Sequence, residues 1–184
     1  MKSFLLSAIA IAALLMLGSE SRGQERSGDP KDFAKLGAPG AEHKVLQKLV
    51  GTWEFSMEGQ EKKGKAHFKS LWDGRFVTED VTLPFGDFTL EWHGIYGYDK
   101  HKKKYTAVWV DNMDTNTESG EGDIDKDGKV LTLKGQHDDP RSGQVEAFLW
   151  RITLVDDTNL KIEMLGVDKD GKTKLELEIR GRRL

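Results

Sequence analysis

Acidic residues occupy alternate positions in the segment DIDKDG at 123–128. This spacing copies the first half of an EF-hand calcium loop, in which alternating side-chain oxygens coordinate the ion. The loop also needs a bidentate glutamate about 12 residues from its start, where this chain has Lys134. Segments typical of strands, not helices, flank it. We therefore predict a hairpin turn without calcium here, and a similar turn at 168–171 (DKDG).

The histidines show no spacing that is typical of a metal or catalytic site. None forms the i, i+4 pair of zinc proteases, and none stands beside a serine in a catalytic arrangement. His137-Asp138-Asp139 could hold a metal ion, but Pro140 follows and favours a polar turn. The chain has no cysteine, which excludes thiol catalysis and cysteine-ligated zinc. We predict no metal site from these residues, which are His43, His67, His93, His101 and His137.

Asp111 is the polar residue whose position most suggests a function. Alternation along 104–113 places it between Trp109 and Met113 on the predicted inner face of a strand. A buried carboxylate is costly unless it is paired, and Arg75 and Arg151 are the predicted partners. Two interpretations remain open: a buried ion pair that fixes strand register, or a polar anchor in a mostly apolar pocket.

The elements that must position these residues are almost entirely β-strands. The segment 42–50 is the one convincing helix of the predicted domain, since its apolar residues share a face and Gly51 follows as a stop. Tight-turn signals separate the later segments, and about ten strands without a second layer favour a closed barrel over an open sheet. We predict an all-β, antiparallel closed barrel with strands at 53–58, 65–72, 75–83, 87–98, 104–113, 115–124, 130–136, 145–154, 160–167 and 174–180.

The beginning of the chain reads as an export signal. A lysine, an apolar run at 4–17 and a small-residue stretch follow one another, so we predict a signal peptide at 1–21, a flexible linker at 22–40 and the barrel domain at 41–184. The apolar run is shorter than the roughly 20 residues that span a bilayer. We expect a periplasmic or secreted protein without stable membrane insertion after cleavage, although a retained signal would act as an anchor.

The net charge of −3 provides no field that would recruit nucleic acid. Aromatic residues are numerous for a core of this size, and most must serve packing. A minority could line a cavity for an apolar or aromatic molecule, and we place Trp53 among them, together with Trp109 and Met113.

Several motifs resemble, in order, those of the bacterial domain-of-unknown-function 1579 family. They are Gly51-Thr52-Trp53 after the helix, WDGRF at 72–76, GYD at 97–99, WVDNMDT at 109–115 and DGKVLTLKG at 127–135. The resemblance spans about 42–183. The family is similar to the calycins, which comprise lipocalins, fatty-acid-binding proteins and nitrobindins, and it implies a cup-shaped barrel with an internal cavity. Nitrobindins bind haem through a late histidine, but none follows His137 here, so we expect no cofactor.

Three functions remain open. The first is a non-enzymatic binder of a small hydrophobic or amphipathic ligand, with Trp53, Trp109 and Met113 as walls and Asp111, Arg75 and Arg151 as anchors. The second is an enzyme that uses Asp111, with Glu79 or His93, as general acid or base. The third is an envelope module that binds another protein through its charged outer strands.

Overall fold

The computed structural model describes residues 30–139 and 142–184. The predicted signal peptide lies outside the described residues. The described elements are α1 (Pro30–Leu36), α2 (Ala41–Gln47), β1 (Gly51–Ser56), β2 (Gly64–Leu71), β3 (Phe76–Phe85), β4 (Phe88–Asp99), β5 (Lys104–Asp111), β6 (Glu118–Ile124), β7 (Val130–Asp138), β8 (Val145–Leu154), β9 (Asn159–Val167) and β10 (Thr173–Arg183). Helix α1 falls within the segment that the sequence predicts to be a flexible linker.

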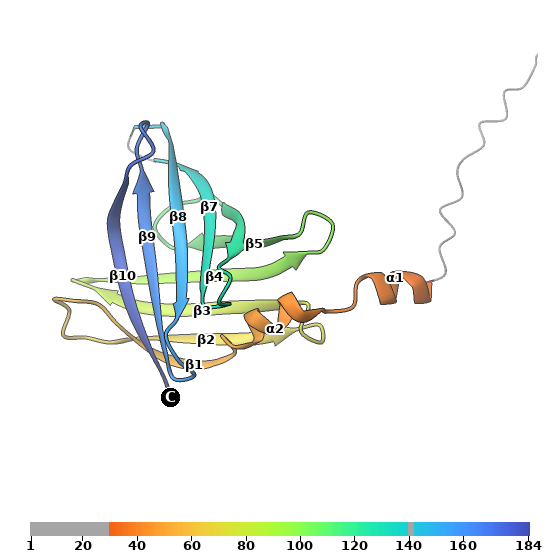
Figure 1. Cartoon of the computed structure of the whole chain (residues 1–184). Coiled ribbons are helices and arrows are strands. Elements are labelled where there is room, and N and C mark those ends of the chain that lie inside the picture. The colour runs from red at the N-terminus through yellow and green to blue at the C-terminus, as the bar shows by residue number, and fades with distance from the viewer. Residues whose placement is uncertain (1–29, 140–141) are drawn as a thin grey trace, which may run out of the picture. The chain divides into compact units, whose positions relative to one another are not determined.

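The strands form a closed antiparallel barrel. Each strand pairs with its neighbours in sequence, and β1 closes the ring by pairing with β10. In Figure 1, β7–β10 run steeply across the direction of β1–β4. Closure leaves no unpaired edge, which confirms the predicted fold class. Among the described residues, no helix is long and apolar enough to span a membrane.

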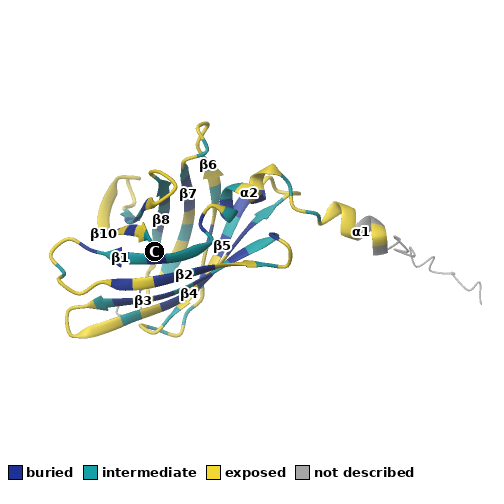
Figure 2. Ribbon diagram, turned by 90° about the horizontal axis from the view of Figure 1, so that it is seen from below, coloured by how far each residue is buried: buried dark blue, intermediate teal, exposed yellow. Residues whose placement is uncertain are grey.

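Alternation along each strand separates a packed interior from a polar exterior. In β3, Val77, Glu79, Val81 and Leu83 are buried, whereas the residues between them are partly exposed. Figure 2 shows the same alternation of buried and exposed segments along the other strands. Apolar side chains on one face of a strand are removed from water when the sheet closes on itself, and this burial is the main driving force for the fold.

Helix α2 closes one end of the barrel. Its Leu46 is buried, and the indole N–H of Trp53 donates to the carbonyl of Leu49 at 2.8 Å. The Arg183 guanidinium lies 4.2 Å from the centre of the Trp53 ring and donates to the carbonyls of Lys48 and Val50. A cation at these carbonyls satisfies groups that the end of a helix leaves unpaired, so the last strand fixes the helix to the barrel.

The turn at 125–129 shows why the calcium-like motif belongs to a hairpin. Asp125 Oδ1 accepts from the backbone N–H groups of Lys129 and Val130, at 2.8 and 3.1 Å. Gly128 has a φ of 66°, a left-handed conformation that glycine adopts without steric cost. The carboxylate of Asp125 therefore stabilises the turn between β6 and β7, as the sequence predicts.

Candidate functional site

The placement of Met113 on the inner wall is wrong. Strand β5 ends at Asp111, and Met113 lies in the following bend with 70% of its surface exposed. The cause is the Asp111 side chain, whose Oδ1 accepts from the backbone N–H of Met113 at 2.7 Å and of Asp114 at 3.4 Å. These bonds turn the chain away from the sheet.

The predicted pairing of Asp111 with an arginine is also wrong. No ion pair within 30–139 and 142–184 joins Asp111 to either arginine. Arg75 donates to the carbonyl of Trp72 at 2.9 Å, before β3 begins. Arg151 alternates with inward-facing residues of β8, so it points outward and lies 3.6 Å from Glu163. Asp111 itself is half-buried at the end of the inner row of β5.

The two predicted aromatic walls are both buried but lie on different cross-strand rows of the barrel. The indole N–H of Trp53 bonds to Leu49 beside α2. Trp109 lies on the row of Gly94, and its indole N–H donates to the hydroxyl of Tyr96 at 3.0 Å. The structure therefore brings Trp109, but not Trp53, to a polar cluster that the sequence analysis did not assemble.

Glu79 is the centre of this cluster. It is fully buried on the inner face of β3, and its Oε2 accepts from the hydroxyl of Tyr96 at 2.7 Å. Glu79 pairs across the sheet with Gly94, and Gly94 pairs with Trp109. A Cβ at Gly94 would come within 3.0 Å of the Glu79 carboxyl and 2.9 Å of the Trp109 ring. Only a glycine at this position leaves room for both groups.

Three buried polar atoms in this region lack a hydrogen bond of good geometry: Glu79 Oε1 and the indole nitrogens of Trp92 and Trp150. The two indoles are still close enough to lower the pKa of Glu79 and of Tyr96, respectively. Trp92 and Trp150 are 8% and 9% exposed. Buried polar atoms are nearly always paired with protein, water or ligand, and each unpaired atom costs about 1–3 kcal/mol. These atoms are therefore available to bind a polar group.

Aromatic rings enclose the cluster. The ring of Trp109 lies 5.8 Å from Tyr96, 6.2 Å from Phe148 and 5.6 Å from Trp150, measured between centroids. Trp92 contacts Trp150 at 6.3 Å. Such separations are typical of packed aromatic pairs, so any occupant of this region has to be small.

Burial dominates the titration of the cluster. It raises the pKa of Glu79 from 4.5 to about 7, although Tyr96 and, more weakly, Trp92 oppose the shift by stabilising the carboxylate. Burial, together with the charge of Glu79, also raises the pKa of Tyr96 well above its ordinary value, and the indoles of Trp109 and Trp150 oppose this shift. Glu79 can therefore change charge near neutral pH, which is typical of carboxyl groups at functional sites.

Further carboxylates lie along the same cross-strand row of side chains, on β6 and β8. Glu118 pairs with Trp109 across the sheet, and its Oε1 lies 3.7 Å from Nδ1 of His137. Nε2 of His137 lies 3.7 Å from Glu146 on β8. Burial raises the pKa of Glu118; His137 opposes the shift, and the charges of Asp111 and Asp114 add to it. This region is therefore predominantly acidic.

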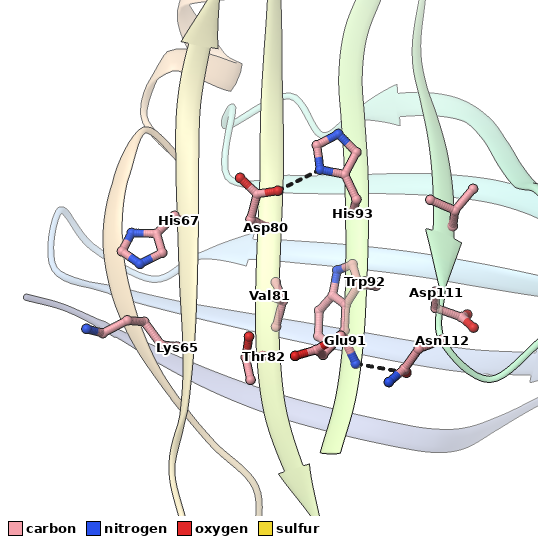
Figure 3. A pocket seen from close by; sticks show the side chains of 11 residues that line it. Lys65, His67, Asp80, Val81, Thr82, Glu91, Trp92, His93, Asp111 and Asn112 are labelled. Carbon is pink, nitrogen blue, oxygen red and sulfur yellow. Dashed lines mark hydrogen bonds and ion pairs between the residues drawn. The ribbon is translucent and has the colours of Figure 1, made fainter. Parts of the chain in front are cut away.

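A second polar cluster lies on the outer face of β2–β5 (Figure 3). It lines an open groove with a volume of about 540 Å³. His67, Asp80 and His93 occupy one cross-strand row, and Nδ1 of His93 lies 2.7 Å from Asp80 Oδ1. Among the described residues, no three histidine, aspartate or glutamate side chains converge to hold a metal ion.

Sequence reasoning did not single out Tyr96, Trp92 and Trp150 as site residues, and it gave Glu79 only a secondary role. A signal was present for Glu79: it stands between Val77 and Val81 at the centre of an apolar strand face. An acidic residue at that position must be buried when the face is buried. The other three are aromatic, and nothing in their spacing separates them from the rest of the core.

The chain belongs to the family described as a protein of unknown function, DUF1579, which matches residues 38–183. Among solved structures, a redesigned beta barrel is similar at 17% sequence identity and a TM-score of 0.38, over 76% of this chain and 95% of that chain. The comparison with curated proteins gives no match. The family description gives no activity, so the residues of the site carry the information on function.

Proposed function

We propose that the protein binds a small amphipathic molecule inside the barrel, with Glu79 as its polar anchor. The observation that carries this proposal is the fully buried Glu79 carboxyl, whose Oε1 has no partner although two unpaired indole N–H groups lie in the same aromatic region. A core without a ligand role would more cheaply place an apolar residue there. The proposal agrees with the calycin resemblance, since calycin barrels enclose cavities.

In this proposal Glu79 takes the anchor role that the sequence predicted for Asp111, Arg75 and Arg151. Trp109 keeps its predicted place in the wall, without Trp53 and Met113. Phe148 and Trp150 complete the apolar wall. The end opposite α2 provides the entrance, because α2 and Trp53 fill the other end. Entry requires the side chains near Trp92 and Trp150 to move aside, as these rings are almost completely buried.

Native mass spectrometry of protein purified from its own host tests the proposal. We expect a bound small molecule at one per chain, and we expect Glu79→Gln to lose it. Glu91→Gln provides the matched control, because Glu91 lies on the outer face of β4 and is exposed. A wild-type protein that carries no ligand, and whose tryptophan fluorescence does not respond to host extracts, would contradict the proposal.

Acid–base catalysis is the second candidate, and it uses the same carboxyl. The observation in its favour is the fully buried Glu79 carboxyl beside the Tyr96 hydroxyl, where burial raises the pKa of Glu79 to about 7, a value that suits a general acid or base at neutral pH. The same mass-spectrometry experiment distinguishes the two. A binding protein releases the captured molecule unchanged, whereas an enzyme releases a different mass after incubation.

Export belongs to the proposal as well. The predicted signal peptide would deliver the barrel to the periplasm or the medium, where a binding protein meets small molecules from outside the cell. N-terminal sequencing of the exported form should find a start between Glu20 and Glu25. Recovery of intact Met1 in the membrane fraction would instead indicate a retained anchor.

A further inference from the structure

We propose that the ligand is a small organic cation, which presents a primary ammonium group to the buried Glu79 carboxylate. The inference rests on the proposed function and names the chemical class of its ligand. Three observations carry it: the unpaired oxygen of Glu79, the donors close to the Glu79–Tyr96 pair, and the carboxylates on the path to it.

The carboxyl group of Glu79 can accept a further hydrogen bond. Tyr96 already donates to Oε2, and Trp109 in turn donates to Tyr96, so this chain of donors ends at the carboxyl group. Oε1 remains without a partner. An ionised carboxylate accepts hydrogen bonds only, so the group that completes the site is an N–H or O–H donor. An ammonium group supplies this donor together with the opposite charge, which makes the bond stronger.

The two unpaired indoles favour the same ligand. Neither indole N–H makes a hydrogen bond of good geometry, yet Trp92 is close enough to Glu79, and Trp150 to Tyr96, to lower the pKa of that group. Trp92 therefore stabilises a negative charge on Glu79, and Trp150 acts on the Tyr96 hydroxyl that donates to Glu79. A neutral carbonyl ligand would need these N–H groups for itself and would leave the buried carboxylate without a counter-charge. A cation keeps the carboxylate ionised and leaves the indoles close to the Glu79–Tyr96 pair.

The surrounding rings can hold a cation in place of water. Trp109, Trp150 and Tyr96 lie edge-to-face or tilted around the carboxyl group, with centroids 5.6–5.8 Å apart. Aromatic faces attract ammonium ions, and they do so more strongly where water is excluded. The close ring packing admits a primary ammonium group more readily than a bulky quaternary one.

The approach to the site is acidic on the β5–β8 side. Glu118 lies next to Trp109 in the sheet, and Asp111 and Asp114 are close enough to raise its pKa. Glu146 on β8 lies beyond His137 in the same row. Like charges in this arrangement repel one another and repel an anionic ligand, whereas an incoming cation relieves the repulsion.

Three four-carbon probes test the inference on the full exported protein at pH 8: n-butylammonium, butan-1-ol and butyrate. They have similar size and differ in charge. Binding is measured by calorimetry and by tryptophan fluorescence. We expect n-butylammonium to bind at least about 10-fold more tightly than butan-1-ol, a difference typical of a desolvated charge interaction. Butyrate should not bind measurably.

Two substitutions locate the effect. Glu79→Gln should reduce the affinity for n-butylammonium to that for butan-1-ol, while the control Glu91→Gln should leave the preference intact. Glu79→Asp is the second variant in case Glu79→Gln does not fold. It keeps the charge, so binding should weaken while the preference for the cation remains.

The outcomes separate this inference from the proposed function. If butan-1-ol or butyrate binds as tightly as n-butylammonium, the cation inference is wrong and the binding function stands. The same conclusion follows if none of the probes binds but the host-derived protein carries a neutral or anionic molecule. If no probe binds and the host-derived protein is empty, both proposals are wrong.

Discussion

Glu79 and Asp80 are neighbours on β3, yet they occupy opposite environments. Glu79 points into the barrel and has no contact with solvent, and burial raises its pKa to about 7. The side chain of Asp80 is 46% exposed on the outer groove, and its bond to His93, followed by the smaller effect of Lys69, lowers its pKa. Because successive side chains of a β-strand point to opposite faces, the pKa shift changes direction between these two neighbouring residues. The comparison shows that position in the sheet, more than residue type, decides which carboxyl group is available for buried chemistry.

The largest effect is expected at Glu79. Its folded-state pKa lies above 4.5, so the native state binds the proton more tightly and stability falls as pH rises from about 4.5 to about 7. Above this window the full penalty is present, about 3 kcal/mol for a shift of this size. Glu79→Gln should therefore increase stability at pH 8 by up to about 3 kcal/mol and have little effect at pH 4.5. Urea unfolding of ligand-free protein at both pH values measures this difference.

Glu91→Gln is again the control, because it removes an exposed carboxyl from the adjacent strand. Glu118 also has a raised pKa and contributes with the same sign. The difference between Glu79→Gln and the wild type, not the absolute slope, therefore isolates Glu79. An unchanged pH dependence in Glu79→Gln would contradict the assignment of the buried charge.

The second effect concerns the space beside Glu79. Gly94→Ala should destabilise the barrel by about 1–3 kcal/mol, because the new methyl group would crowd the Glu79 carboxyl and the Trp109 ring. Ile95→Ala is a matched control, since Ile95 is 39% exposed on the other face of β4. It should cost about 0.5 kcal/mol or less, as exposed substitutions usually do. Equal losses for both variants in urea unfolding would contradict the close packing at Gly94.

The fold could be predicted from the sequence because turn signals and alternation repeat along the chain. A row of apolar residues identifies the inner face of each strand, as Val77, Val81 and Leu83 do in β3. A sheet of ten such strands without a covering layer has to close into a barrel. The same logic makes Glu79 readable as an inward-facing acid. The cluster around it could not be predicted, because Trp150 on β8 meets Trp109 and Trp92 only after the sheet has closed around one interior.

Asp111 shows where alternation fails. The parity of β5 correctly continues to Asp111, but the strand ends there because the side chain bonds to the following backbone N–H groups. Aspartate favours such local bonds over sheet pairing. The two-residue alternation of a strand can therefore identify its inner face, but it cannot show at which residue the chain leaves the sheet.

The third effect tests this local role. Asp111→Ala should cost about 1 kcal/mol, the usual value of the lost hydrogen bonds, whereas a buried ion pair with an arginine would cost about 3–5 kcal/mol. Asp111→Asn should cost less than Asp111→Ala, because its side-chain oxygen can still accept from Met113. Urea unfolding of the two variants at pH 7 gives both values. A decrease of more than about 3 kcal/mol in the free energy of unfolding of Asp111→Ala would instead support a buried, paired Asp111.

The smallest effect is expected at Asp80 and completes the comparison with Glu79. Because its pKa is lowered, Asp80 stabilises the fold above its unfolded-state pKa of 3.8, and this contribution disappears as pH falls through the lower folded-state value. The sign is opposite to that of Glu79. Exposure to solvent limits the size, so Asp80→Asn should cost about 0.5 kcal/mol or less at pH 7, and less again at about 1 M salt, which screens the bonds to His93 and Lys69. Unfolding at pH 7 and pH 3, at low and high salt, measures both dependences. A larger, salt-independent loss would mean that the outer groove is as desolvated as the interior, and the contrast between the two faces of β3 would no longer hold.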